Sequence, residues 1–387
     1  MILIDVTRLV VRFRAGRLAT GVDRVGLAYV RHYRSQAQAL IRWAGRSWVL
    51  PAKQSQQLFA WLLQPTSKHF ALRMIIQGII LGGYRHSWPG ALLFNTGHSG
   101  LELTQYPAMI KKMRVRPLFV LHDLIPITHP EYCRGNEDAK HVIRMTRMLE
   151  LAVGIVTNSE ATRQDLIGFA QQSKTPLPPT VTAWLAPEMA GIKAQKRLIA
   201  APYFVLLSTI EPRKNHVLIL QIWRRLVEQM GDNAPRLVVI GQRGWECENV
   251  IDLLERCQSL KGVVFELNTC TDADLVAYLR HAQALLFPSF AEGYGMPLIE
   301  ALSLGVPVIA SDLPVFHEVA KDIPEYIDPL DGKQWLACIM NYLTPHSVQR
   351  QAQLERILHF VVPSWAAHFE RVDALIAKLS TTNPAGE

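Results

Sequence analysis

Short apolar runs of four to eight residues recur along this 387-residue chain and alternate with longer amphipathic stretches. Continuous apolar runs of this length are typical of strands buried on both faces. Their alternation with helical patterns is typical of parallel sheets covered by helices. The length suits two domains of ordinary size better than one. The sequence therefore predicts an α/β protein with two parallel-sheet domains.

The predicted elements follow this alternation from one end of the chain to the other. The predicted strands are residues 1–6, 91–95, 118–122, 154–157, 203–208, 236–240, 263–266, 284–288 and 307–311. Helices are predicted after Gly21, before Gly154, and from about Ser159, Asn215, Glu248, Asp272, Gly295, Val315 and Ser364. Ser159 is a favourable N-cap residue, and Thr271 with Asp274 has the spacing of a capping box.

Charge is distributed unevenly between the two halves of the chain. Residues 1–195 contain 24 Lys and Arg against 11 Asp and Glu, a net charge of +13, and the remainder carries −5. The first half is therefore expected either to face an anionic partner or to expose a solvated basic surface. A lipid surface, a lipid-linked pyrophosphate acceptor and nucleic acid are the anionic candidates.

Several classes of protein are disfavoured by what the sequence lacks. No run of about 18 uncharged apolar residues occurs, and the first residues do not resemble a signal peptide. The five scattered cysteines include no Cys-x-x-Cys, so we expect reduced thiols in a cytoplasmic protein rather than a zinc site. No P-loop motif is present, and no Gly-x-Gly-x-x-Gly follows the first strand, which disfavours P-loop nucleotidases and dehydrogenases.

The segment 288–312 carries the clearest chemical signal. It is predicted to run strand, glycine loop, helix, turn, strand, with Gly295 and Pro297 at the start of the helix. Such a helix start offers unpaired N–H groups and a partial positive charge to an anion. Glu292 and Glu300 flank it, and Glu300 has apolar neighbours, so its carboxylate is expected to be paired or bound to a ligand. A carboxylate accepts two hydrogen bonds at once, which suits the hydroxyls of a sugar.

This segment resembles the signature of the retaining glycosyltransferase family 4. Glu292 and Glu300 stand with seven residues between them in the sequence Glu-Gly-Tyr-Gly-Met-Pro-Leu-Ile-Glu-Ala. Further resemblance occurs, in order along the chain, at residues 20–24, 122–123, 157–160, 211–215 and 241–245.

The resemblance implies a GT-B fold, in which two Rossmann-like domains with parallel sheets face each other across a cleft. The predicted domains are 1–195, which binds the acceptor, and 196–363, which binds the nucleotide-sugar donor. A linker is expected near residues 193–202. A last helix, within 364–387, is expected to cross back to the first domain.

The resemblance also implies roles for residues of the donor domain. Arg213 and Lys214 would neutralise the donor diphosphate in place of a metal ion; the alternative is a solvated basic turn. Many members carry an Arg directly after the residue that closes the first donor-domain strand. Here Ser208-Thr209 stands there, so Arg213 is expected to substitute. Glu300 would hold the ribose hydroxyls, and Glu292 would contact the donor sugar.

The remaining residues implied by the resemblance are backbone groups and a histidine. Gly295, Met296 and Pro297 would present backbone groups to phosphate or sugar. Gly21 would let the backbone of the first domain approach the leaving phosphate. His122 would lie beside the donor sugar at the reaction centre; the alternative is a structural histidine at the end of a strand.

The expected function is retaining transfer of a sugar to a glycan or lipid-linked glycan in bacterial surface-polysaccharide synthesis. No nucleic acid, metal or other cofactor is expected, and Asp272-Ala-Asp274 is interpreted as a helix cap rather than a metal motif.

GDP-mannose is the favoured donor because residues 211–215 resemble the loop of bacterial mannosyl- and rhamnosyltransferases. A UDP-sugar or dTDP-rhamnose is the alternative donor. The alternative functions are a same-fold epimerase and a degenerate transferase acting as a binding subunit. The basic first half predicts peripheral contact with the inner face of the cell membrane.

Overall fold

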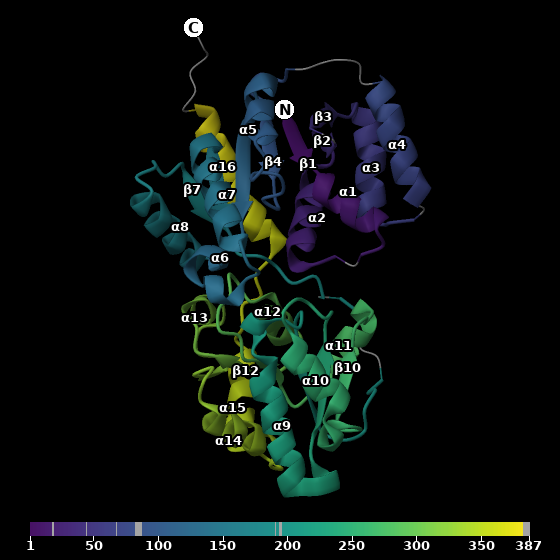
Figure 1. Ribbon diagram of the computed structural model, residues 1–387, viewed down its shortest axis with the longest axis vertical. Coiled ribbons are helices and arrows are strands. Elements are labelled where there is room, and N and C mark those ends of the chain that lie inside the picture. Colours follow the sequence, from purple (N-terminus) through teal and green to yellow (C-terminus); the bar gives the residue numbers. More distant parts are fainter. Residues whose placement is uncertain are drawn as a thin grey trace. The chain divides into compact units, whose positions relative to one another are not determined.

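The polypeptide forms two compact units (Figure 1). The computed structural model describes residues 1–17, 19–43, 45–66, 68–81, 87–189, 191–192 and 196–381. Unit 1 consists of Met1–Ile127, Asp138–Leu185 and Trp365–Glu387. Unit 2 consists of Thr128–Glu137 and Ala186–Ser364.

This division differs from the domain boundaries predicted from the sequence. The predicted first domain extends to residue 195, whereas the second segment of unit 1 ends at Leu185. Thr128–Glu137, predicted to belong to the first domain, packs with unit 2. Residues 193–195, at the start of the predicted linker, lie outside the described residues.

Unit 1 is built on a seven-stranded sheet in the order β3-β2-β1-β4-β5-β6-β7. Its strands are β1 (Ile2–Asp5), β2 (Ala37–Trp43), β3 (Arg46–Val49), β4 (Leu92–Asn95), β5 (Arg116–Leu121), β6 (Gly154–Thr157) and β7 (Thr180–Thr182). All neighbours pair in parallel except β3, which forms an antiparallel hairpin with β2. The order of strands reverses between β1 and β4, and loops at such a switch point leave a crevice at the carboxyl ends of the strands.

The helices of unit 1 pack against this sheet. They are α1 (Thr7–Arg14), α2 (Gly21–Tyr33), α3 (Ala52–Leu63), α4 (Lys68–Leu81), α5 (Gln105–Met113), α6 (Ile125–Thr128), α7 (Glu137–Leu151), α8 (Glu160–Gln172) and α16 (Trp365–Thr381). The predicted N-cap of α8 is confirmed, because the Ser159 side chain accepts a hydrogen bond from the Thr162 amide at 3.0 Å.

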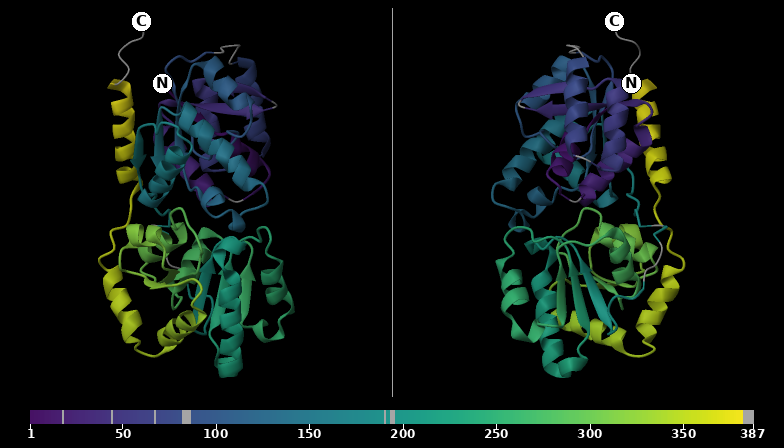
Figure 2. Two further views of the ribbon diagram at one scale, coloured as in Figure 1. Left: turned by 60° about the vertical axis from the view of Figure 1, so that its left-hand side comes forward. Right: turned by 90° about the vertical axis from the view of Figure 1, so that its right-hand side faces the viewer.

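The last helix, α16, packs against β6 and β7 of unit 1, and Figure 2 shows it in yellow along this unit. Phe369 is its main anchor: the ring is 4% exposed and stacks on His32 with centroids 3.8 Å apart. Tyr29 and Tyr33 of α2 contact Phe369 edge-on, at 5.1 and 5.6 Å. The Tyr33 hydroxyl donates to Asp373 at 2.6 Å. Aromatic contacts thus attach α16 to α2.

Unit 2 contains a six-stranded, fully parallel sheet in the order β10-β9-β8-β11-β12-β13, the strand order of a Rossmann fold. The strands are β8 (Tyr203–Leu207), β9 (Arg236–Ile240), β10 (Val264–Leu267), β11 (Leu285–Phe287), β12 (Val308–Ser311) and β13 (Glu325–Ile327). The helices are α9 (His216–Met230), α10 (Glu248–Arg256), α11 (Asp272–Arg280), α12 (Met296–Ser303), α13 (Pro314–Ala320), α14 (Gly332–Leu343) and α15 (Val348–Ile357). At α11, the expected cap is confirmed: the Thr271 hydroxyl accepts from the Asp274 amide at 3.1 Å.

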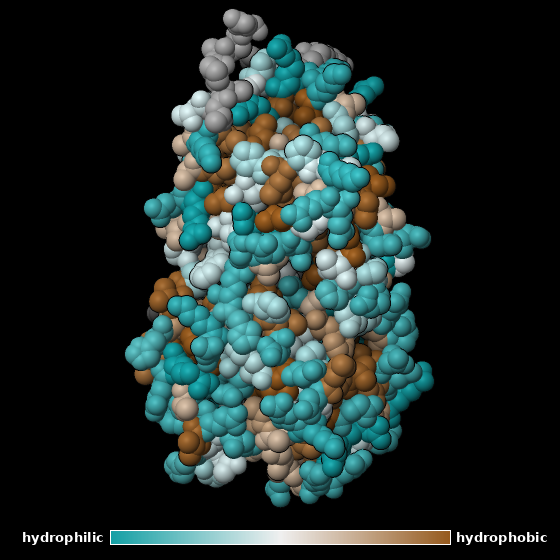
Figure 3. Space-filling view, turned by 90° about the vertical axis from the view of Figure 1, so that its left-hand side faces the viewer, coloured by the Kyte–Doolittle hydropathy of each residue, from teal (hydrophilic) through white to brown (hydrophobic). Residues whose placement is uncertain are grey.

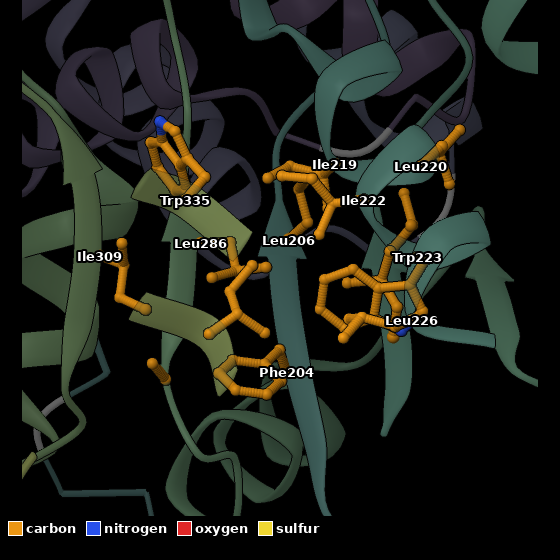
Figure 4. Packing of buried hydrophobic residues seen from close by; sticks show 14 of the residues in the cluster. Phe204, Leu206, Ile219, Leu220, Ile222, Trp223, Leu226, Leu286, Ile309 and Trp335 are labelled. Atoms are coloured by element: carbon orange, nitrogen blue, oxygen red, sulfur yellow. The ribbon is translucent and has the colours of Figure 1, made fainter. Parts of the chain in front are cut away.

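Buried side chains from both the sheet and the helices of unit 2 form one core (Figure 4). Trp223 of α9 packs edge-on against Phe204 of β8 with ring centroids 5.7 Å apart, and its indole N–H donates to the Pro235 carbonyl at 2.9 Å. Trp335 of α14 is fully buried and donates to the Asp328 carbonyl at 3.0 Å. Each buried indole therefore keeps a partner for its polar group.

The described residues include no helix long and apolar enough to cross a membrane. On the face shown in Figure 3, hydrophilic side chains predominate and hydrophobic residues lie in small groups among them.

We predict that Phe369→Ala lowers the free energy of unfolding by about 3–5 kcal/mol, because it removes a buried ring from an aromatic cluster. Urea unfolding monitored by circular dichroism measures the change. Val361→Ala is the control, since Val361 is 83% exposed and its loss should have little effect. Equal midpoints for the two variants would show that α16 contributes little to the stability of unit 1.

Candidate active site

Three loops of unit 2 follow strands that are neighbours in the sheet, at the same carboxyl edge. They follow β8, β9 and β11, and the strand order reverses between β8 and β11. Ligands of open α/β sheets bind at such switch points. The loops carry the predicted donor residues Arg213, Lys214, Glu292 and Gly295.

A buried cluster of charges connects the loop after β8 with the loop after β11. The Lys214 ammonium donates to one oxygen of the Glu292 carboxylate, and Arg213 lies 3.0 Å from the other oxygen. Arg213 also pairs with Glu211 at 2.8 Å and donates to the Ala291 carbonyl at 2.5 Å. The side chains of Lys214, Arg213 and Glu292 are 11%, 17% and 8% exposed.

Burial and neighbouring charges shift the pKa values of this cluster. Burial alone would raise the pKa of Glu292, but the adjacent Arg213 and Lys214 cations outweigh it and lower the pKa to about 2. Burial lowers the pKa of Lys214, with a further contribution from the positive charge of Arg213. Glu292 is therefore ionised at neutral pH.

The cluster pairs each cation with a carboxylate, which the sequence did not predict. Arg213 and Lys214 were expected to direct their charge at a donor diphosphate, whereas here Glu211 and Glu292 compensate it. The loop after β8 ends at Asn215, whose backbone is left-handed (φ 53°) and whose side-chain amide donates to the Pro329 carbonyl at 2.9 Å. This turn places Lys214 next to Asn215, which is the N-cap residue of α9.

The loops after β8 and β9 are bound to each other beyond the ends of their strands. Ile210 donates to the Gln242 carbonyl, and the Gly244 amide donates to the Ile210 carbonyl, both at 2.9 Å. A Cβ at Gly241 would lie 1.9 Å from the Ser208 carbonyl oxygen, so only glycine allows this approach. Trp245 extends the charge cluster, since its indole N–H lies 3.3 Å from Glu211.

The start of α12 is shaped by Gly295. This residue is the left-handed N-cap of the helix, with φ 94°, and a Cβ would lie 2.6 Å from a ring carbon of Phe316. Pro297 occupies the first turn, as predicted. Glu300 lies on the following turn and is 6% exposed, so it is not an exposed helical residue.

Two further residues of the site region were missed by the sequence analysis. Tyr132 stacks on Phe290, with rings 5.0 Å apart and 5° from parallel, and the Arg134 guanidinium lies 6.0 Å from the Trp245 ring. Both come from the segment Thr128–Glu137. No local sequence pattern predicts these contacts, because they join segments more than a hundred residues apart in sequence.

His122 lies directly after β5 in unit 1 and is 8% exposed. Its Nε2 lies 2.7 Å from the Thr96 carbonyl oxygen, which can only accept, so the ring carries its proton on Nε2. Burial lowers the pKa of His122, so the imidazole is neutral at pH 7 and Nδ1 is a hydrogen-bond acceptor. His98 packs against it with centroids 5.3 Å apart, and burial also lowers the pKa of His98.

Gly21 is the first residue of α2, after a turn that a buried carboxylate holds in place. Asp23 is fully buried and accepts from the amide and the hydroxyl of Thr20 at 2.8 and 2.7 Å. Arg8 and Arg12 pair with Asp23 at 2.9 and 2.7 Å. A Cβ at Gly21 would meet no described atom within 4 Å, so packing within the chain does not require glycine there.

The structure therefore groups the predicted site residues into two sets. Arg213, Lys214 and Glu292 form the charge cluster of unit 2, with Gly295 and Glu300 on the adjoining loop and helix. His122 and Gly21 lie in unit 1. Asp23 and Glu211, which hold residues of the two sets in place, were not predicted as site residues.

We predict that Gly295→Ala destabilises the protein more than Gly305→Ala, by about 1–3 kcal/mol. Both glycines have positive φ, but a Cβ at Gly305 would have open space, whereas one at Gly295 would strike Phe316. The difference in unfolding free energy thus isolates the contact with Phe316 from backbone strain. Equal losses in the two variants would contradict a steric constraint at the start of α12.

Comparison with known proteins adds an independent observation. Residues 192–324 match the family model described as "Glycosyl transferases group 1". The serotype-specific mannosyltransferase WbdA of Escherichia coli is 28% identical over 275 residues, covering 65% of this chain and 34% of that protein. The O-antigen chain mannosyltransferase B of Escherichia coli is 29% identical over 260 residues, covering 65% of this chain and 67% of that protein. O-antigen chain mannosyltransferase RfbU of Salmonella typhimurium is 34% identical over 145 residues, covering 36% and 38% of the two chains.

The chain spans about a third of the length of the WbdA proteins. Among solved structures, sucrose-phosphate synthase from Thermosynechococcus elongatus has a TM-score of 0.67 at 14% identity, covering 99% of both chains. HepE from Anabaena, in complex with UDP-glucose, has a TM-score of 0.65 at 13% identity, covering 98% of both chains. The protein thus has the fold of GT-B glycosyltransferases, and residues 192–324, within its second unit, are similar to the glycosyl transferases group 1 family.

Proposed function

We propose that this protein is a glycosyltransferase that moves a sugar from a nucleotide donor to a glycan or lipid-linked glycan during assembly of a surface polysaccharide. The observation that carries the proposal is the buried Lys214–Glu292 pair at the switch point of a Rossmann-type sheet. A buried ion pair contributes little net stability, because desolvation offsets its attraction, and groups with shifted pKa values cluster at functional sites. The names of the bacterial relatives, which are O-antigen mannosyltransferases, support this reading.

The chemistry follows from where charge develops. Cleavage of the bond between the sugar and the phosphate builds negative charge on the leaving diphosphate and positive charge on the sugar ring. Lys214 and the N–H groups at the start of α12 stabilise the diphosphate, because preorganised donors act strongly in a site shielded from water. Glu300 accepts hydrogen bonds from the ribose hydroxyls, and Glu292 faces the donor sugar while it orients Lys214.

Retention of the anomeric configuration is part of the proposal. In a front-side reaction, the anomeric carbon loses its bond to the phosphate oxygen and gains a bond to the acceptor oxygen on the same face. The acceptor hydroxyl gives its proton to the leaving phosphate oxygen. His122 supports this step as a neutral ring whose Nδ1 accepts a hydrogen bond from a donor-sugar hydroxyl. We assign no covalent nucleophile.

GDP-mannose is the proposed donor, because the curated relatives quoted above are mannosyltransferases. The diphosphate contacts are common to all donors, so the base must be selected elsewhere. The loop Gly241–Trp245 is the candidate, since its backbone is fixed against the loop after β8 and can present groups to the edge of a base. A UDP-sugar or dTDP-rhamnose is the alternative.

The test is turnover of GDP-mannose, a panel of UDP-sugars and dTDP-rhamnose, each in the presence of EDTA. We expect release of GDP from GDP-mannose without added metal, because Arg213, Lys214 and the start of α12 supply the positive charge. Conversion of the donor sugar without acceptor and without release of nucleotide would indicate an epimerase. Binding without turnover of any donor would indicate a binding subunit. Loss of activity in EDTA, restored by magnesium or manganese, would contradict a metal-independent site.

In the same assay, Lys214→Ala and Glu300→Gln should each reduce transfer tenfold or more, which corresponds to about 1.4 kcal/mol at the barrier. Lys261→Ala and Glu228→Gln are matched controls, since both residues are exposed on the surface of the same unit. A folded variant at Lys214 or Glu300 with the rate of the wild type would remove that residue from the site.

A second proposal concerns peripheral attachment to anionic membranes through unit 1. The helices α1 and α4 contact each other and carry the exposed residues Val11, Ile76 and Ile80, which are 50%, 48% and 72% exposed. These apolar side chains lie in the half of the sequence that carries a net charge of +13. Apolar insertion combined with attraction of about 1 kcal/mol per basic residue favours such binding.

Flotation with anionic and neutral vesicles tests this attachment. Binding should require anionic lipid and should weaken in high salt, because salt screens the attraction. Ile80→Glu should reduce recovery, whereas Val361→Glu, an exposed position of unit 2, should not. Equal recovery with both kinds of vesicle would count against the idea.

A further inference from the structure

A hollow of about 470 Å³ lies in unit 1 at the turn of the β2–β3 hairpin. Trp43 and Arg46 of the hairpin line it, together with Leu103 and Gln105 from the region where α5 begins. Its volume falls within the range of about 300–1,000 Å³ that is typical of small-molecule sites. None of the residues proposed above for the transfer reaction lines it.

Two large apolar side chains in this hollow are left uncovered by the fold. Trp43 is 64% exposed and Leu103 is 50% exposed. A single exposed apolar residue is ordinary on a protein surface. Here both exposed residues line the same concave region, so they offer an apolar surface to a ligand that enters it.

Two of the three charged residues that line the hollow, Arg42 and Glu102, have partners within the unit. The Arg42 side chain, which is 13% exposed, pairs with Asp5 at 2.7 Å, and its guanidinium lies 4.9 Å from the Tyr106 ring centroid. Glu102 pairs with Arg144 at 3.0 Å. These pairs compensate two of the three charges, and the third, Arg46, is exposed to solvent. A diphosphate needs several cations, so the hollow suits a neutral polar ligand better.

A sugar ring has this chemistry, because it combines an apolar C–H face with a rim of hydroxyl groups. An indole packs against such a face, while carboxylate and amide groups exchange hydrogen bonds with the hydroxyls. We propose that this hollow binds a sugar unit of a neutral acceptor glycan, apart from the sugar that receives the transferred residue. Trp43 is its stacking surface, and Gln105 and Glu102 contact the hydroxyls. The assignment of the glycan as acceptor rests on the proposed function.

The hollow is connected to His122 through one hydrogen-bonded stretch of chain. Thr96 accepts from His122, and the Asn95 amide donates to the Ser99 carbonyl and to the Tyr106 hydroxyl at 3.3 and 3.0 Å. Ser99 and Tyr106 line the hollow. The position of the hollow is therefore fixed relative to His122 by hydrogen bonds within unit 1.

The test is direct binding to the full chain, measured by saturation-transfer NMR and calorimetry with mannotetraose, maltotetraose and inorganic pyrophosphate. GDP is kept in excess so that the donor site is occupied. We expect at least one tetrasaccharide to bind, and Trp43→Ala to weaken this binding at least tenfold. Gln105→Ala should weaken it as well. Trp184→Ala is the matched control, because Trp184 is a partly exposed tryptophan of unit 1 that does not line the hollow.

Failure of both tetrasaccharides to bind the wild-type protein would overturn the inference, as would equal binding by Trp43→Ala. Binding of pyrophosphate in a manner that depends on Trp43 would also overturn it. Because the readout is binding, its result is independent of turnover. If the hollow binds glycan while no nucleotide sugar is turned over, the proposed function fails and the glycan site stands.

Discussion

The buried pairing of the Glu292 carboxylate with Lys214 and Arg213 is the interaction on which the proposed donor region depends. It joins the loop after β8 to the loop after β11 through two ion pairs. Removal of one partner from a buried pair typically costs about 3–5 kcal/mol, because a charge is left without compensation. The position of Lys214, and with it the entry to α9, is therefore coupled to the loop that leads into α12.

This pairing changes how a diphosphate would be bound. A site of two uncompensated cations would attract any anion, including free phosphate. In the present cluster, Glu211 and Glu292 already accept from the cations, so an incoming diphosphate has to compete with a carboxylate for the same donors. The low pKa of Glu292 means that protonation does not relieve this competition near neutral pH. Binding then depends on additional contacts with the sugar and the base, which favours a whole nucleotide sugar over phosphate alone.

The sequence predicted the parts of the fold that are encoded locally. Strands such as β8 and β9 are continuous apolar runs, and their predicted and observed positions nearly coincide. The strand β2 was missed because Gln38 and Arg42 interrupt its apolar pattern. The three-residue strands β7 and β13 were missed because they lack the continuous apolar run of the equally short β11. For the candidate site, Glu300 was recognised by its apolar neighbours. The carboxylates Asp23 and Glu211 were not: each has one partner within three residues, but their other partners, Arg8, Arg12 and Trp245, are set by tertiary packing. Thr128–Glu137 joins unit 2 for the same reason.

The buried candidate residues of the two units do not follow the trend of net charge along the sequence. The first half is strongly basic, yet its candidate reaction residue, His122, is a neutral acceptor whose protonation is opposed by burial. The second half is acidic overall, yet it holds the buried cations Arg213 and Lys214. Net charge therefore reflects the charge of the surface, which governs encounters with partners. It says little about the chemistry of a buried site. In the proposed reaction, the leaving diphosphate needs fixed cations, which unit 2 holds, whereas hydroxyls of the sugars can be bound by neutral acceptors such as His122 or by carboxylates such as Glu300.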